Sequence, residues 1–211
     1  MKAADNRADF RSFVEIVVAG DIARAVDLLD AHPQLATECC MRGASRQGAR
    51  ANFFDCIGHY IYAGDSAVHM AAAAQQSRII SELISRGADV HARNRRGAQP
   101  LHYAADGGPG SPAWNPEAQV KIIAALVRAG ADPNALDNSG VAPLHRAVRN
   151  RCANAVMALI KAGADPRLPN KRGSTPMQLA GMNTGKSGSG SPAAKEQRLQ
   201  IVRILEQYAT R

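Results

Sequence analysis

The sequence of 211 residues predicts an all-α solenoid, in which helix–turn–helix units with hairpin-like loops are stacked in a row. Three observations lead to this prediction. A short phrase that begins with glycine recurs along the chain, and apolar residues with helical spacing lie between its copies. In addition, 45% of the residues are apolar but only 4% are aromatic. The core must therefore consist of small and aliphatic side chains, which suit closely packed helices.

The recurring phrase marks the start of each unit. Its copies begin at Gly64, Gly97, Gly140 and Gly173, and so lie 33, 43 and 33 residues apart. A second phrase, Gly-Ala-Asp, keeps the same phase at residues 87–89, 130–132 and 163–165. Proline occupies the first helical turn in three units, where its missing N–H costs nothing, and the glycine of the second phrase ends a helix. Each unit is therefore predicted as a helix pair followed by a turn.

A 33-residue unit that carries Thr-Pro-Leu-His and Gly-Ala-Asp is typical of one family. The chain has Pro-Leu-His at residues 100–102 and 143–145, and it resembles the ankyrin repeat family, in particular small stand-alone bacterial members. The resemblance implies that His69, His102 and His145 form hydrogen bonds within the hairpin network. It also implies a protein-binding module without catalysis, whose partner lies along the concave face and the hairpin tips.

The repeats divide the chain into a single domain of about five units, counting both ends. The predicted segments are an N-terminal capping helix pair at residues 10–35, an aromatic insertion at 36–62, repeats at 64–96, 97–139 and 140–172, and a C-terminal repeat at 173–211. Gly20 is expected to split the first helix pair. The outward positions of the last helix are polar, as suits a cap that faces water.

Two units are longer than the repeat. The second has ten additional residues at 107–116 between its helices, and the fourth has a Gly/Ser-rich insertion that includes residues 184–193. Both insertions contain Gly-Ser-Pro-Ala just before or at the start of the second helix. We expect these loops to project from the edge opposite the hairpins.

The insertion at residues 36–62 holds four of the nine aromatic residues of the chain. Despite Gly58, some of its apolar side chains have helical spacing, namely Phe53, Phe54, Ile57, Tyr60 and Ile61. The favoured interpretation is an extra helix that covers the edge of the first repeat. The alternative is an aromatic patch that binds a partner.

Two motifs suggest chemistry, and for both the plainer interpretation is favoured. Residues 180–187 fit a permissive phosphate-loop pattern, but they follow a helix instead of a strand and lead into further glycine and serine, so nucleotide binding is not expected. Cys56 and His59 have a spacing that can hold zinc, but the adjacent side chains of Cys39 and Cys40 point apart and complement it poorly. Ordinary thiols are expected there, with a metal site as the alternative. No cofactor, metal ligand or catalytic residue is predicted, because no nucleophile and base pair is apparent.

The composition also bounds the location. No apolar run approaches the roughly 20 residues of a membrane-spanning helix, and the first nine residues are polar and charged with no apolar segment behind them. Four cysteines in a chain of this size do not make a disulfide framework. We therefore expect a cytoplasmic protein with reduced thiols.

The formal net charge of +8 permits an acidic partner but does not identify one. The resemblance places a set of mainly basic and aromatic residues on the concave face, the hairpin tips and a long loop. This predicted contact set is Arg93, Arg95, Arg96, Tyr103, Asp106, Trp114, Arg146, Arg149 and Arg172. Arginine and aromatic residues dominate protein interfaces, so an acidic protein partner is the favoured hypothesis. Nucleic acid or another polyanion is the alternative, and neither a membrane nor a small-molecule substrate is expected.

Overall fold

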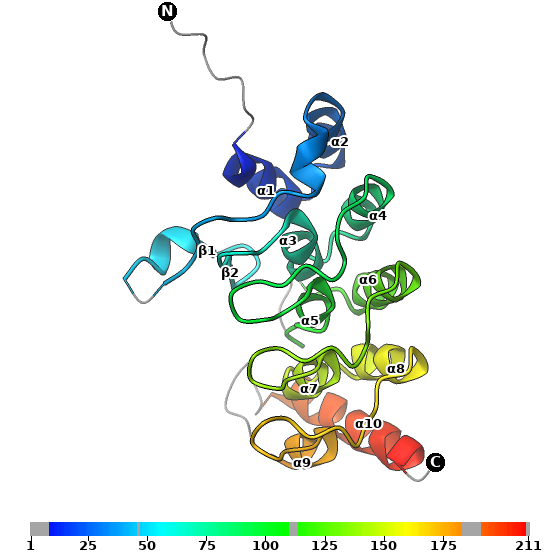
Figure 1. Cartoon of the computed structure of the whole chain (residues 1–211). Coiled ribbons are helices and arrows are strands. Elements are labelled where there is room, and N and C mark those ends of the chain that lie inside the picture. The colour runs from blue at the N-terminus through cyan, green and yellow to red at the C-terminus, as the bar shows by residue number, and fades with distance from the viewer. Residues whose placement is uncertain (1–8, 46, 110–113, 183–190, 210–211) are drawn as a thin grey trace, which may run out of the picture.

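The computed structural model describes residues 9–45, 47–109, 114–182 and 191–209. Helices stacked in pairs run from one end of these residues to the other (Figure 1). The α-helices are, in chain order, α1 (Phe10–Ala19), α2 (Ile22–Ala31), α3 (Ala67–Ala73), α4 (Ser77–Ser85), α5 (Pro100–Ala104), α6 (Pro116–Arg128), α7 (Pro143–Arg149), α8 (Ala153–Lys161), α9 (Pro176–Gly181) and α10 (Pro192–Ala209). Between α2 and α3 lie two short 3₁₀ helices, Pro33–Ala36 and Arg50–Asn52, and the strands β1 (Phe53–Phe54) and β2 (His59–Tyr60).

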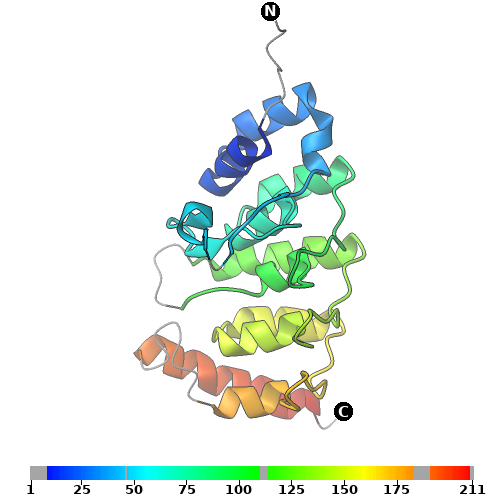
Figure 2. The same cartoon turned by 60° about the vertical axis from the view of Figure 1, so that its left-hand side comes forward.

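The helices form two layers. The first helices of the pairs, α1, α3, α5, α7 and α9, pack on one another in order, and the second helices, α2, α4, α6, α8 and α10, pack in the same order beside them. Figure 2 shows the elongated stack that results, with α1 and α2 at one end and α9 and α10 at the other. The prediction of an all-α solenoid is confirmed.

Aliphatic side chains fill the space between the layers. The apolar positions of the second helices are buried as their spacing predicts, namely Ile79, Ile80, Leu83, Ile122, Ile123, Leu126, Val156, Leu159 and Ile160. The alanines of α3, at Ala67, Ala71 and Ala72, are also fully or almost fully buried. Such small side chains let neighbouring helices approach closely, so the repeat needs few aromatic rings in its core.

The first helix pair shows how local sequence sets the ends of the elements. Asp9 caps α1, because its Oδ1 accepts a hydrogen bond from the backbone N–H of Arg11 at 3.2 Å. Gly20 ends α1 with φ of +78°, a conformation that favours glycine. Asp21 then caps α2 through the N–H of Arg24 at 3.1 Å. The chain thus reverses within two residues at the expected glycine.

The prediction of an extra helix in the insertion (residues 36–62) is wrong. Residues 53–60 form a β-hairpin in which Phe53 pairs with Tyr60 and Phe54 pairs with His59. Aromatic residues favour strands, and Gly58, with φ of +60°, lies in the turn that reverses the chain. The helical spacing of the apolar residues thus has no bearing on the local structure.

The insertion is joined to the first repeat by its backbone. The N–H of Cys40 donates to the carbonyl of Asp65 at 2.8 Å, the N–H of Gly64 donates to the carbonyl of Cys40 at 2.7 Å, and Cys39 forms an isolated bridge with Ser66. Phe54 and Ile61 are buried in the main core. The insertion is therefore an integral part of the described structure.

Parts of the two long loops, residues 110–113 and 183–190, lie outside the described residues, and with them most of the phosphate-loop-like string at 180–187. Because these residues are not described, the direction in which the two loops project stays a prediction. The four cysteines are described and unpaired. None of the helices in the described ranges is long and apolar enough to cross a membrane.

Candidate interaction surface

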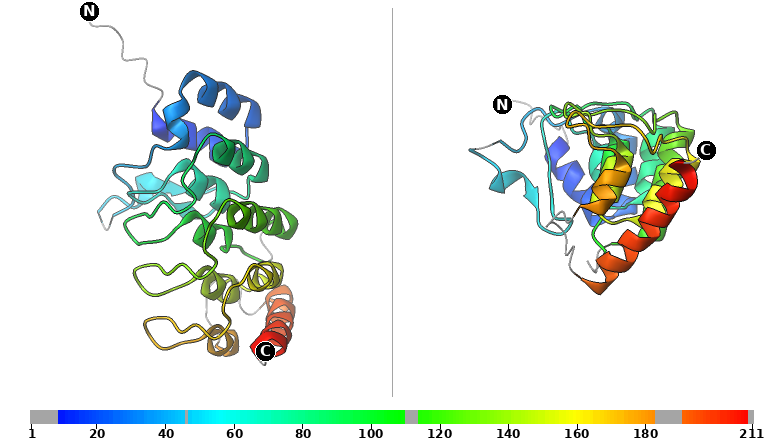
Figure 3. Two further views of the ribbon diagram at one scale, coloured as in Figure 1. Left: turned by 45° about the vertical axis from the view of Figure 1, so that its right-hand side comes forward. Right: turned by 90° about the horizontal axis from the view of Figure 1, so that it is seen from below.

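Four pairs of residues at the tips of the loops form a continuous column. The left view of Figure 3 shows the loops that precede α5, α7 and α9 projecting one above another on the same side of the stack. We define the tip column as Tyr62–Ala63, Arg95–Arg96, Asn138–Ser139 and Lys171–Arg172. A repeated backbone hydrogen bond connects neighbouring tips: Arg95 N–H to Ala63 O at 2.8 Å, Asn138 N–H to Arg96 O at 2.9 Å, and Lys171 N–H to Ser139 O at 3.3 Å.

An asparagine or aspartate shapes each of the last three tips. Oδ1 of Asn94 accepts hydrogen bonds from the N–H groups of Arg96 at 2.9 Å and Ala98 at 3.1 Å. Asp137 and Asn170 accept the equivalent pairs in the next two units. These side chains thus fix the backbone of each turn.

The glycine that follows each tip allows the tips to stack closely. Gly140 has φ of +69°, and a Cβ atom there would approach the backbone nitrogen of Lys171 to 2.8 Å. Any other residue at this position would therefore be strained and would push against the next tip.

Three of the predicted contact arginines are exposed on the column: Arg95, Arg96 and Arg172. Arg149 is exposed at the end of α7. Arg93 is also exposed, but its Nη1 donates to the carbonyl of Leu136 at 2.9 Å, so it bridges two neighbouring loops.

Tyr62 belongs to this surface and is absent from the predicted contact set. Nη1 of Arg96 donates to the Tyr62 hydroxyl at 3.0 Å, and the guanidinium carbons of Arg95 and Arg96 lie 5.2 Å and 5.1 Å from the centre of its ring. Its phase in the repeat could have revealed this position, because Tyr62 precedes Gly64 by two residues as Arg95 precedes Gly97.

The predicted exposure of Tyr103 is wrong, because its side chain is only 1% exposed. The Tyr103 hydroxyl donates to Oδ2 of Asp65 at 2.9 Å and accepts from Nδ2 of Asn94 at 2.9 Å. The ring of His59, from the hairpin of the insertion, lies with its centre 4.5 Å from that of Tyr103. The insertion thus covers the aromatic residue that the sequence places on the open concave face.

Asp65 is fully buried at the centre of this polar cluster. Besides Tyr103, its carboxylate accepts hydrogen bonds from Asn94 Nδ2 at 2.8 Å and from the N–H of Tyr62 at 2.6 Å. Burial and the neighbouring Asp65 charge both raise the pKa of Tyr103, so its hydroxyl stays protonated and acts as a donor.

Asp106 and Arg146, both in the predicted contact set, pair with each other inside the molecule. Nη1 of Arg146 donates to Oδ2 of Asp106 at 3.1 Å, and Nδ2 of Asn150 donates to Oδ1 at 2.8 Å. Burial disfavours the charge of Asp106, but the charges and hydrogen bonds of Arg146 and His59 outweigh it, so the pKa of Asp106 is lowered. Nη2 of Arg146 also reaches Asp137 at 3.4 Å.

His59 connects the insertion to this ion pair. Its Nε2 lies 3.6 Å from Oδ2 of Asp106. Burial opposes protonation of the imidazole, but the nearby carboxylate of Asp106 outweighs that effect, and the pKa of His59 is raised. Protonation of His59 therefore strengthens the contact between the hairpin and the second repeat.

Trp114 is half-buried instead of standing at the tip of a loop. The indole packs against the main core, and its Nε1 donates to Oε1 of Gln119 at 3.2 Å. Gln119 in turn donates from Nε2 to the carbonyls of Ala104 and Asp106, both at 3.0 Å. Trp114 thus helps to anchor the chain where α6 begins.

The repeated histidines cap the first helices. Nδ1 of His69, His102 and His145 accepts a hydrogen bond from the backbone N–H three residues earlier, in each case at 3.1 Å. Nε2 of His69 and His102 lies 3.1 Å and 2.9 Å from the carbonyls of Ala98 and Val141 in the next unit. Burial lowers the pKa of all three, that of His102 to about 4, so the imidazoles are neutral and Nε2 carries the proton.

Comparison with known families agrees with this geometry. The ankyrin repeat family matches residues 63–95 and 96–138, and the related family of ankyrin repeats in many copies matches residues 126–180. Together the matches extend over more than half of the chain. The chain belongs to the ankyrin repeat family. A comparison with curated proteins gives no match.

Ankyrin repeats are generally protein–protein interaction modules. The two single-repeat matches begin one residue before the units that the glycine phrase defines at Gly64 and Gly97. The histidine bonds, the helix pairs and the projecting loops all recur with this ankyrin period.

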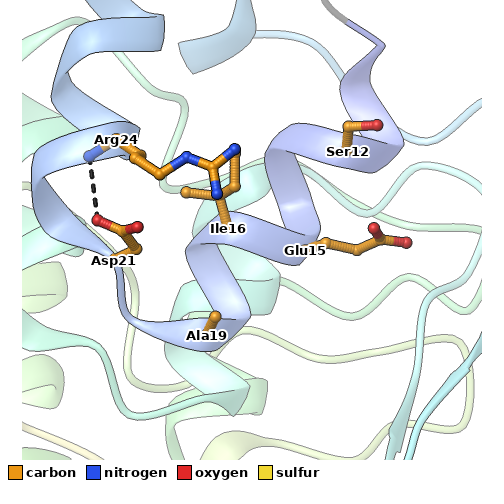
Figure 4. A pocket seen from close by; sticks show the side chains of 6 residues that line it. All are labelled: Ser12, Glu15, Ile16, Ala19, Asp21 and Arg24. Carbon is orange, nitrogen blue, oxygen red and sulfur yellow. Dashed lines mark hydrogen bonds between the residues drawn. The ribbon is translucent and has the colours of Figure 1, made fainter.

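A metal site and a surface hollow are the two alternatives to the tip column as a binding site. In the described part of the chain, no three His, Cys, Asp or Glu side chains lie close enough together to hold a metal ion. Figure 4 shows a hollow beside α1 and the start of α2, lined by Ser12, Glu15, Ile16, Ala19, Asp21 and Arg24. Its lining residues are exposed or half-buried, whereas small-molecule sites usually enclose most of the ligand surface. We therefore regard the tip column as the better candidate for function.

Proposed function

We propose that this ankyrin repeat protein binds an acidic protein partner along its tip column and has no catalytic role of its own. The observation that supports this proposal is the charge of the column. Two of its four tips, Arg95–Arg96 and Lys171–Arg172, carry exposed basic side chains, and none of its residues is acidic. The nearby carboxylate of Asp137 is occupied by the backbone of its own loop and by Arg146.

The contacts that we propose are Arg95, Arg96 and Arg172 on the column, together with Arg149 on α7. Tyr62 adds an aromatic ring whose centre lies 5.2 Å and 5.1 Å from the guanidinium carbons of Arg95 and Arg96. Arginine and tyrosine are enriched at the energetic centres of protein interfaces, so this combination suits a protein partner. The unpaired cysteines are consistent with a reducing compartment, and we propose a cytoplasmic location.

A charge-reversal experiment tests the proposal. The variant Arg96→Glu/Arg172→Glu changes two exposed tips, whereas Lys121→Glu/Arg128→Glu makes the same change of charge on α6, outside the column. In quantitative pull-downs we expect the first variant to lose, about tenfold or more, a partner that the wild type and the second variant retain. Identical recoveries from all three proteins would contradict the proposal.

A titration distinguishes a protein partner from nucleic acid. Sequence-tolerant nucleic-acid binding needs aromatic rings on which bases stack. Tyr103 is buried, and the ring of Tyr62 is already in contact with the guanidinium groups of Arg95 and Arg96. We therefore expect no saturable binding of a fluorescent single-stranded oligonucleotide at about 50 mM salt. Tight binding that the Arg96→Glu/Arg172→Glu variant abolishes would favour a polyanion partner instead.

A further inference from the structure

The charges along the tip column are unevenly spaced. The tip Arg95–Arg96 is basic, the next tip Asn138–Ser139 is uncharged, and the last tip Lys171–Arg172 is basic again. The first tip, Tyr62–Ala63, is uncharged. Two cationic sites are therefore separated by one neutral unit.

The middle tip, Asn138–Ser139, is bonded to the tips on both sides of it. Nδ2 of Asn138 donates to the carbonyl of Arg95 at 3.1 Å, so this side chain is used to join two tips. The adjacent Asp137 accepts bonds from its own loop and pairs with Arg146, which pairs with Asp106 as well. Nζ of Lys171 donates to the carbonyl of Asn138 at 2.8 Å, so one charge of the last tip lies against the middle tip, and Arg172 carries the other charge of the last tip.

The backbone fixes the distance between the two basic sites. Each tip is bonded to the next through the backbone, as described above, so the spacing of tips follows the spacing of the stacked helices. Packed helices lie about 8–10 Å apart, which places tips two units apart at roughly 16–20 Å. An extended chain covers this distance in about five or six residues.

We infer that the partner presents an extended segment with two clusters of carboxylates about six residues apart, one for each basic tip. This inference rests on the proposed function, because it specifies the acidic partner. An extended segment fits better than a broad anionic surface, since the charges lie in a single row. A segment that reaches both tips gains affinity because its second cluster binds at a high effective concentration.

Synthetic peptides test the spacing directly. Three fluorescent peptides share the same Glu, Gly and Ser content: one has two Glu-Glu pairs with about four neutral residues between them, one has all the Glu residues together, and one has about ten neutral residues between the pairs. Fluorescence anisotropy with the full chain at about 50 mM salt gives the three affinities. We expect the first peptide to bind at least about fivefold more tightly than the other two.

Charge reversals at each tip identify the two sites. Either Arg95→Glu/Arg96→Glu or Lys171→Glu/Arg172→Glu should abolish the advantage of the first peptide, because only one basic tip then remains. The control Lys121→Glu/Arg128→Glu carries the same net charge as these variants and should retain the advantage. Circular dichroism spectra of all variants at the same temperature verify that each is folded.

Three outcomes would overturn the inference, and they differ in what they say of the proposed function. Equal affinity for the three peptides, or equal loss in the tip and control variants, would show attraction by charge without spacing and would leave an acidic partner in place. No binding of any peptide, even at about 20 mM salt, would overturn the acidic partner as well.

Discussion

At the residue scale, the repeated histidine shows how burial couples stability to pH. Each imidazole is neutral and caps its own helix, and two of them also contact the next unit. Burial lowers the pKa of His102 to about 4, whereas an unfolded histidine has a pKa near 6.5. As the pH falls from 6.5 to 4, the unfolded chain binds this proton before the folded one. Stability is therefore lost across that window, by roughly 3 kcal/mol for His102 at its lower end.

The fourth repeat suggests a variant that isolates this effect. Gln178 replaces the histidine there, and its Oε1 accepts the N–H of Thr175 at 2.8 Å. We therefore expect His102→Gln to fold at pH 7. Between pH 7 and pH 4.5 it should lose roughly 2–3 kcal/mol less unfolding free energy than the wild type, as measured by urea denaturation. An equal loss in both proteins would show that His102 does not titrate as described.

Sequence reasoning succeeds at the residue scale where the partners are close in the chain. The cap of each first helix involves residues three apart, so the phrase itself predicts a structural histidine. The burial of Tyr103 depends on Asp65 and on His59, which come from other units and from the insertion. The repeat predicts which face of α5 carries Tyr103, but it carries no information on which residues cover that face.

At the element scale, the hairpin of the insertion is the element that sequence reasoning predicts wrongly, as a helix. Phe53, Phe54 and Tyr60 occur at intervals that suit a helix, yet they pair across two short strands. Helical periodicity over so few residues competes with strand propensity and with a glycine in a turn, and here the latter two determine the structure. The helix pairs were predictable because each has several apolar positions in phase and a repeat to confirm them.

The contact between His59 and Asp106 gives the hairpin its own dependence on pH. Asp106 and Asp65 favour the imidazolium form of His59, and its folded pKa is raised. The stabilisation from this group is therefore present below the unfolded pKa of about 6.5 and is lost as the pH rises through the folded value. We expect the amide protons of Ala44 and Ile61 to lose about threefold of their protection between pH 6 and pH 8, after correction for intrinsic exchange.

Hydrogen exchange on the His59→Gln variant completes this test. Glutamine does not titrate, so the protection of the same two amides should vary little between pH 6 and pH 8. The amide of Leu159 in α8, on another helix pair, serves as the internal reference in both proteins. The same pH dependence in the variant would contradict a role for His59.

At the scale of the whole molecule, four of the basic residues lie on the tip column, and the binding that we propose depends on their placement. The shape of the column comes mainly from backbone hydrogen bonds and from Asn94, Asp137 and Asn170, and Nζ of Lys171 adds one bond to the carbonyl of Asn138 at 2.8 Å. A charge can therefore be added to the neutral tip with little change in shape. Ser139 is exposed there and offers the simplest position.

We expect Ser139→Arg to shift the preferred spacing of an acidic peptide. With adjacent tips charged, clusters about three residues apart should bind as tightly as clusters about six apart, since neighbouring units are separated by roughly 8–10 Å. Anisotropy titrations with both peptides measure the ratio. Ser81→Arg, which adds the same charge to α4, should leave the wild-type preference unchanged. A shift in the control as well would mean that total charge governs binding.

The contacts of the insertion with the second repeat also affect how cooperatively the stack unfolds. In a simple repeat protein each unit contacts only its neighbours, so the units can unfold one after another. Here the hairpin that precedes α3 contacts Tyr103 and Asp106 beyond it, and Asp106 is bound in turn by Arg146 and Asn150. The units from α3 to α7 are thereby linked beyond nearest neighbours and should melt as one cooperative block, with α9 and α10 at its fraying end.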